Sequence, residues 1–144
     1  MTLPNLPPDH LWPLTQETAQ AFYDWVYAPW VKDLGLTDFV VRDGFCSMRL
    51  PLGDHLKFSS GTVCGQAVMA AIDTVASMAV STGPRIAKGT VYQHTHFLRP
   101  AVGDDVLVAA TVKRFGKSSA YVDCCVTFAG PGELVAHAVL EFIF

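Results

Sequence analysis

The chain has 144 residues, which is enough for one domain with a sizeable apolar core. Hydrophobic residues make up 51% of it and charged residues only 16%, so we expect a subunit interface to cover part of the apolar surface. The net charge of −3 and the absence of a basic stripe argue against nucleic acid as a partner.

We expect neither a secretory signal nor a membrane span. The first twenty residues carry prolines and acids instead of a basic start followed by an apolar run. The longest apolar stretch, residues 67–80, contains Asp73 and is too short to cross a bilayer. No Cys-x-x-Cys pair occurs among Cys46, Cys64, Cys124 and Cys125. We therefore expect reduced thiols, a cytoplasmic location and no membrane partner.

The N-terminal part predicts an irregular arm followed by a helix. Residues 1–14 are rich in proline, and a helical pattern runs over residues 15–34, where Pro29 should break or kink the helix. Its aromatic face is expected to pack in a core, as a lid over a sheet or an interface, and consists of Phe22, Trp25, Val26 and Trp30.

Six strands are expected around one further helix. Residues 39–52 predict a β-hairpin that turns at Asp43-Gly44. Short turns separate four later strand-like runs, which predict an antiparallel meander and cover residues 89–99, 105–115, 118–128 and 134–144. A curled antiparallel sheet around a single apolar helix would be an α+β fold, formed here by one domain, residues 1–144.

The stretch over residues 59–84 predicts an apolar helix, which follows a loop over residues 53–60 and carries one carboxylate. It ends at Gly83, where we expect a left-handed cap before the following proline. Asp73 lies about 20° around the helix from Gln66 and about 40° from Ser77, so the three form one polar stripe. Asp73 is either a structural residue held by Ser77 or a neighbouring strand, or a carboxylate that faces a cleft with Ser77 orienting it.

Two segments carry a resemblance to a known family. The first reads Gly61-Thr-Val-Cys-Gly-Gln-Ala-Val-Met-Ala-Ala-Ile-Asp73, and the second reads Phe97-Leu-Arg-Pro-Ala-Val-Gly-Asp104. Together with the last hairpin, they resemble the PaaI-like (4-hydroxybenzoyl-CoA thioesterase-type) acyl-CoA thioesterases of the hotdog fold, over roughly residues 34–144. The resemblance implies hydrolysis of an acyl-CoA thioester to acid and coenzyme A, no cofactor, and a homodimer or homotetramer.

The resemblance also implies catalytic roles. Asp73 matches the family's catalytic carboxylate, as general base or nucleophile, with Ser77 orienting it. Gly65 matches the glycine whose backbone N–H polarises the thioester carbonyl. The two residues are about 12 Å apart along the helix, too far to meet one carbonyl within a single chain. In a hotdog dimer, the glycine of one subunit faces the carboxylate of the other.

Other positions imply substrate contacts. Cys64 stands where the family usually has histidine, Gln66 where it has a second glycine, and Phe58 where it often has a loop amide. Gln66 or Thr62 would then have to supply the second oxyanion donor. Three basic residues lie at positions that meet the coenzyme A phosphates in the family: Arg99, Arg114 and Lys117. The alternative is that they are ordinary solvated charges.

Other residues and other functions are also compatible with parts of this pattern. Cys64 is disfavoured as a nucleophile because no histidine stands near it in sequence. His94 and His96 share a strand face as metal ligands might, but no third ligand is in sight, so we expect no metal site. The rival functions are a non-catalytic acyl-CoA-binding or regulatory protein and a 3-hydroxyacyl-thioester dehydratase. The dehydratase is the weaker rival because no histidine falls in or just before the apolar helix.

Overall fold

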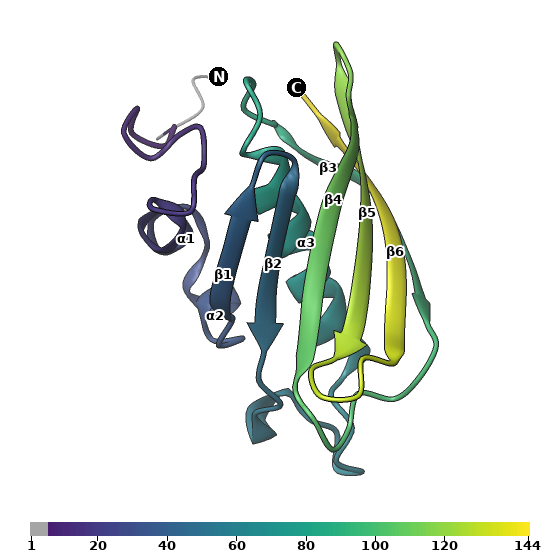
Figure 1. The fold of residues 1–144 in the computed structure, drawn as a ribbon. Coiled ribbons are helices and arrows are strands. Elements are labelled where there is room, and N and C mark those ends of the chain that lie inside the picture. The colour runs from purple at the N-terminus through teal and green to yellow at the C-terminus, as the bar shows by residue number, and fades with distance from the viewer. Residues whose placement is uncertain (1–5) are drawn as a thin grey trace.

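The computed structural model describes residues 6–144, so the first five residues of the predicted arm lie outside the described residues. Residues 6–14 are irregular, as expected. Four short or long helices and six strands follow, and Figure 1 shows their arrangement: α1 (Ala19–Val26), α2 (Pro29–Lys32), β1 (Thr37–Arg42), β2 (Phe45–Leu50), the 3-10 helix η1 (Asp54–Leu56), α3 (Gly65–Val80), β3 (Gly89–Phe97), β4 (Val106–Phe115), β5 (Ser119–Phe128) and β6 (Leu134–Ile143).

The six strands form one antiparallel sheet in the order β1-β2-β4-β5-β6-β3. The predicted hairpin is confirmed, and its turn glycine, Gly44, adopts the expected positive φ of 67°. The predicted four-strand meander is wrong for β3, which pairs with β6 at the far edge instead of with β4. Residues 98–105 are not a tight turn but a crossover, fixed where the Val63 N–H donates to the Ala101 carbonyl.

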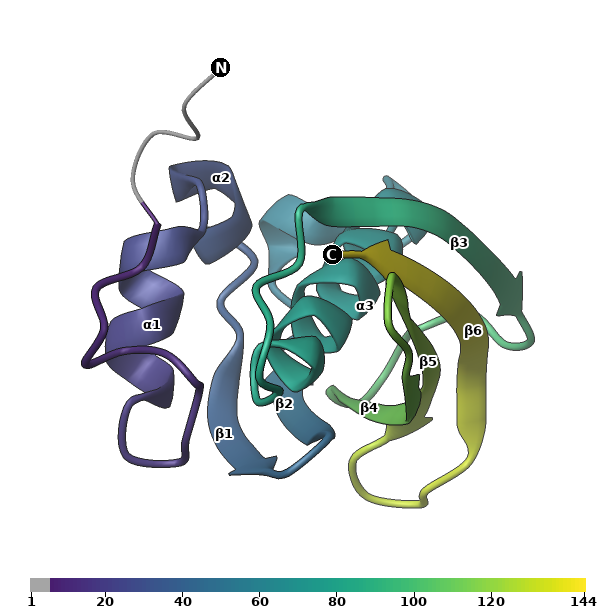
Figure 2. The same cartoon turned by 90° about the horizontal axis from the view of Figure 1, so that it is seen from above.

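Helix α3 lies in the concave face of the sheet, as Figure 2 shows from above. Ala71, Ile72, Val75 and Met78 on its buried face are fully enclosed, and they pack against the apolar residues that alternate along the strands. The α+β arrangement predicted from the sequence, a curved sheet around one apolar helix, is therefore confirmed.

The C-terminal end of this helix differs from the prediction. The helix begins at Gly65, after a loop that extends to residue 64, and ends at Val80. The expected left-handed cap at Gly83 is wrong, because Gly83 is not among the residues with positive φ. Glycine is needed there for space: a Cβ on Gly83 would lie 2.5 Å from the ring of Phe115.

The N-terminal helices flank β1 (Figure 2). Pro29 ends the first helix and begins the second, as the sequence predicted. Phe22 is buried, but Trp25, Val26 and Trp30 are 42%, 39% and 62% exposed. Within one chain the predicted core packing is therefore confirmed for Phe22 alone, and packing of the other three residues at an interface stays a prediction. The Gln16 side-chain amide donates to the Phe39 carbonyl and accepts from the Val41 N–H, which closes the outer edge of β1.

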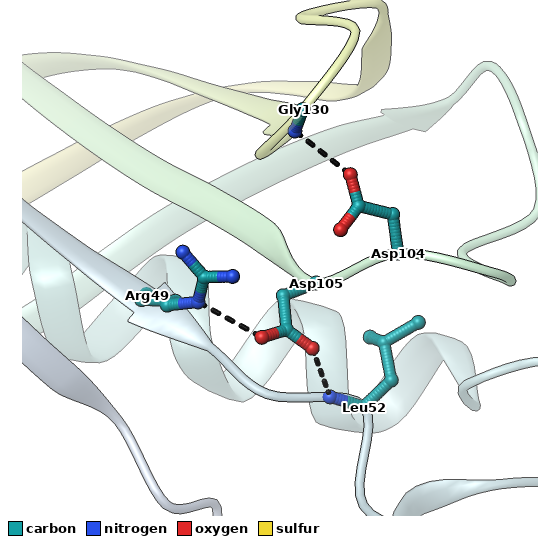
Figure 3. Close-up of polar contacts among 5 residues, drawn as sticks. All are labelled: Arg49, Leu52, Asp104, Asp105 and Gly130. Atoms are coloured by element: carbon teal, nitrogen blue, oxygen red, sulfur yellow. Dashed lines mark hydrogen bonds and ion pairs between the residues drawn. The ribbon is translucent and has the colours of Figure 1, made fainter.

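Two adjacent aspartates tie three loops together below the helix N-terminus (Figure 3). Asp104 accepts a hydrogen bond from the Gly130 N–H at 2.7 Å. Asp105 accepts from Arg49 Nε at 2.8 Å and from the Leu52 N–H at 3.1 Å. The bond from Arg49 and that from the Leu52 N–H hold the pKa of Asp105 below its usual range. This cluster fixes the end of the crossover, residues 98–105, which forms one wall of the candidate site.

Candidate active site

Asp73 lies in the middle of α3 and is half-buried. Its Oδ1 accepts a hydrogen bond of 2.6 Å from Thr90 Oγ1 at the start of β3. Ser77, one turn further along the helix, donates instead to the Thr74 carbonyl at 2.8 Å and is hydrogen-bonded to the Tyr27 hydroxyl. The expected orienting contact from Ser77 to Asp73 is therefore corrected: Thr90 is the residue that holds the carboxylate.

A cavity of about 370 Å³ opens beside Asp73. Ser77 and Thr90 lie on its polar side, next to the carboxylate. The rest of its wall is mainly aromatic and comes largely from the N-terminal segment: Trp12, Phe22, Trp25, Tyr27 and, from β6, Phe142. Burial raises the pKa of Tyr27, so this hydroxyl stays neutral. A carboxylate at the mouth of an apolar cavity is suited to chemistry on an apolar group held inside it.

The N-terminus of α3 offers free donors. Cys64 occupies the N-cap position but makes no side-chain cap bond. Its carbonyl accepts the N–H groups of Ala67 and Val68, whereas no hydrogen bond from the Gly65 or Gln66 N–H is found among the described residues. Uncapped N–H groups at a helix N-terminus carry partial positive charge and can stabilise a developing oxyanion.

A second cavity, of about 320 Å³, lies at this helix end. Its lining includes four residues singled out from the sequence: Phe58, Thr62, Gly65 and Arg99. The ring of Phe97 packs so closely that a Cβ on Gly65 would lie 3.3 Å from it. The Arg99 guanidinium is paired with Glu133 at 3.2 Å and donates to the Leu134 carbonyl. The structure thus places these four lining residues together at the N-terminus of α3, whereas Asp73 and Ser77 line the other cavity.

Two predicted contacts lie elsewhere. Gln66 lines a third cavity with Trp30 and His55, and does not line either of the other two. Lys117 lies in the turn between β4 and β5, where it shares a small polar hollow with Arg114.

The cysteines and histidines are not arranged as catalytic groups. Burial raises the pKa of Cys46 to about 12 and also raises the pKa of Cys124 and Cys125. His55 Nε2 is hydrogen-bonded to the Asp33 carbonyl, not to Cys64. Within residues 6–144, no group of three or more His, Cys, Asp or Glu side chains is placed to hold a metal ion.

Sequence reasoning missed the partners of Asp73 and Ser77. Thr90 belongs to a predicted strand, and strand alternation could have placed it on the helix-facing side. Trp12 and Tyr27 gave no such signal, because no local pattern shows that the N-terminal segment packs against α3 and that the Tyr27 hydroxyl reaches Ser77.

Comparison with known proteins agrees with this geometry. Residues 60–135 match the family model described as the thioesterase superfamily, and this range includes both Gly65 and Asp73. The Thermoplasma volcanium protein named Putative esterase TV1331 is 36% identical over 87 residues. That match covers 60% of this chain, and the chain spans just under two thirds, 65%, of that relative.

Solved structures share the fold. Zebrafish thioesterase superfamily member 2 has a TM-score of 0.80 at 20% identity, over 90% of this chain and 98% of that one. The E. coli PaaI protein of the phenylacetic acid degradation operon has a TM-score of 0.75 at 22% identity, over 88% and 90%. The Streptococcus mutans protein smu.793, bound to acetyl-CoA, has a TM-score of 0.67 at 22% identity, over 74% and 87%. These likenesses confirm the predicted hotdog fold.

Proposed function

This chain belongs to the thioesterase superfamily, and we propose that it hydrolyses an acyl-CoA thioester to a free acid and coenzyme A. The observation that carries the proposal is the division of α3 into two half-sites. One cavity holds a carboxylate without an oxyanion donor, and the other holds free N–H donors without a carboxylate. Each half supplies what the other lacks for attack on a thioester carbonyl.

The chemistry uses groups already in place. The Asp73 carboxylate, held by Thr90, either removes a proton from the attacking water or itself attacks the carbonyl carbon to form a mixed anhydride. The Gly65 N–H stabilises the oxyanion, and the thiolate of coenzyme A leaves. Thr62 is the better placed of the two candidate side chains for a second donor, because it shares the cavity with Gly65 and Gln66 does not.

The two half-sites come together if two chains pair along β3. This strand lies at the open edge of the sheet and exposes Val91 and Tyr92 by 52% and 53% (Figure 1). The opposite edge, β1, is already closed by Gln16. An open edge strand favours pairing with a second copy. Antiparallel pairing about a two-fold axis would bring the Gly65 end of one chain to the Asp73 region of the other. The assembly is therefore a homodimer, with a homotetramer as the larger form.

The substrate would lie across this interface. Its acyl group occupies the aromatic cavity beside Asp73, where apolar contact stabilises it. Arg99 of one chain, at the Gly65 cavity, and Lys117 with Arg114 of the other are the cations that would meet the coenzyme A phosphates. The acetyl-CoA bound to the Streptococcus mutans protein supports a coenzyme A thioester as the substrate class.

The reaction needs no cofactor. None of the described helices is both long and apolar enough to span a membrane. Four free thiols, two of them buried, favour a cytoplasmic location.

The proposal is tested with two variants, each assayed for the release of free thiol from a panel of acyl-CoA substrates. Asp73→Asn should lower kcat at least roughly 100-fold, because neither base nor nucleophile remains. Gly65→Pro removes the backbone N–H donor at the first position of the helix, where proline is tolerated. The neighbouring Phe97 ring is half-exposed and can move aside for the proline ring.

Co-expression of the two variants then separates a shared site from a single-chain site. In a mixed dimer, one site has both defects and the other has neither, so a random mixture should recover about a quarter of wild-type activity. A single-chain site predicts no recovery. Full activity of Asp73→Asn would exclude the hydrolase.

A non-catalytic acyl-CoA-binding protein remains the alternative, favoured by Phe58 in place of a loop amide at the Gly65 cavity. Tight acyl-CoA binding without thiol release would establish it. A dehydratase is not supported, because among residues 6–144 no histidine lines either of these two cavities.

A further inference from the structure

We propose that His94 and His96 form a chelate site for one divalent transition-metal ion, of the Cu²⁺ or Ni²⁺ type, on the outer face of β3. The sequence alone favoured no metal here for want of a third ligand. The structure adds a relation between the two rings that spacing along a strand could not supply.

The two imidazoles bring their Nε2 atoms together on the same face of β3. Their Nε2 atoms are 2.9 Å apart, and the ring planes meet at 81° with centroids 4.5 Å apart. With metal–nitrogen bonds of about 2.05 Å, two nitrogens at 90° around a metal lie about 2.9 Å apart, and two at a tetrahedral angle about 3.3 Å. The observed separation is that of a hydrogen bond, and it is also the separation of two nitrogens at 90° around a square-planar or octahedral ion, the geometries that Cu²⁺ and Ni²⁺ prefer.

The surroundings leave the site accessible. Both side chains are exposed on the outer face of the sheet, on the side away from α3. Within residues 6–144, neither Nε2 atom makes a hydrogen bond except to the other. Water can therefore complete the coordination of a bound ion. In the apo protein, one ring donates its Nε2–H to the other. When an ion binds, the donor ring carries its proton on Nδ1 instead, through exchange with water, so that both Nε2 lone pairs bind the ion and no net proton is released.

A third histidine lies close but is already occupied. His137 of β6 is directly opposite His96 in the strand register. Its Nε2 is bonded to Asp123 Oδ1 at 2.9 Å. The His137–Asp123 pair is therefore a neighbour of the site and not part of its ligand set, in agreement with the absence of a three-ligand group within residues 6–144.

The experiment is a titration of the tag-free protein with Cu²⁺ and Ni²⁺ by calorimetry, with the Cu²⁺ form examined by electron paramagnetic resonance. We expect one ion per chain, an electron paramagnetic resonance signal showing two equivalent nitrogen ligands, and weaker binding of Zn²⁺. His94→Ala and His96→Ala should each lower the affinity at least roughly tenfold. With either histidine removed, the ion is held by one ligand and the advantage of a second ligand at high effective concentration is lost.

His137→Ala is the matched control, since it removes a histidine from the same face without removing a ligand, and it should leave the affinity unchanged. A loss as large as that of His94→Ala would overturn the two-histidine site. So would the absence of saturable binding, one ion per two chains, or equal losses on His55→Ala, which would mark adventitious binding. These outcomes do not depend on thioester hydrolysis, so failure here leaves the proposed function untouched.

Discussion

Asp73 depends on a single short hydrogen bond, from Thr90 on the open edge strand. The donor lies 17 residues further along the chain and belongs to a different element. The carboxylate is thus positioned by the strand that we propose as the dimer edge, which links the geometry of the site to assembly.

Thr90→Val keeps the shape of this side chain and removes its hydroxyl. Without this hydroxyl the Asp73 carboxylate loses its fixed orientation, so we expect kcat to fall at least roughly tenfold. Thermal stability should change little, because Thr90 is exposed and water can replace the lost hydrogen bond. Thr90→Ser should restore most of the rate. Steady-state kinetics of both variants would check this, with the exposed Thr111→Val as control. An unchanged rate for Thr90→Val would show that Asp73 needs no support from β3.

At the scale of elements, the N-terminal segment is hydrogen-bonded to the central helix through the Tyr27 hydroxyl and, at the C-cap, through the Leu14 N–H, which donates to the Ser81 carbonyl. Tyr27 follows α1 and hydrogen-bonds Ser77 of α3, 50 residues away. It also donates toward the Thr74 carbonyl at 3.3 Å. This contact brings an aromatic wall to the cavity at Asp73.

Tyr27→Phe should lower the free energy of unfolding by about 1 kcal/mol at pH 7, since Ser77 keeps its bond to the Thr74 carbonyl. Because burial raises the pKa of Tyr27, the folded state keeps this proton while the unfolded chain ionises above pH about 10. Wild-type stability therefore falls above that pH, and the difference from Tyr27→Phe should shrink. Urea titrations at pH 7 and above pH 10 measure it; a difference that grew with pH would contradict the assignment.

The loops at the other end are fixed by the pair of Asp105 and Arg49 (Figure 3). The folded-state pKa of Asp105 lies below its value in the unfolded chain, so the pair stabilises the fold above the ordinary carboxyl pKa of about 4 and is lost as the pH falls through the lowered value.

Asp105→Asn should accordingly lower the melting temperature at pH 7 and have little effect in acid, below the folded-state pKa. Melting curves across this range, with the solvent-exposed Asp54→Asn as control, would check the trend. An equal loss at every pH would attribute the effect to the loop hydrogen bonds instead of the charge.

At the scale of the whole molecule, the two edges of the sheet are unequal. Gln16 closes β1, whereas β3 is open and has exposed apolar side chains. A charge on an open edge opposes strand pairing.

Val91→Lys should therefore reduce the mass in solution to that of a single chain and abolish activity together with it. Val40→Lys places the same charge on the opposite edge, at a side chain that is 46% exposed, and should change neither property. Light scattering combined with the thiol-release assay would test both. Dissociation by Val40→Lys alone would move the interface to β1.

Local pattern was enough for much of this protein. The turn at Gly44, the apolar run of α3, strand alternation and the break at Pro29 depend on neighbours a few residues apart. The motif ending in Asp73 indicated the candidate carboxylate and oxyanion glycine, whose roles remain proposals.

Tertiary structure decided what joins these parts. The place of β3 beside β6 depends on a crossover and on sheet order, which no local period encodes. Thr90 meets Asp73, and Tyr27 meets Ser77, only after the sheet closes on α3, because packing alone brings such distant residues together. The sequence by itself determined the helix and its carboxylate; the fold decided which side chains hold that carboxylate and that the two half-sites of one helix lie in separate cavities.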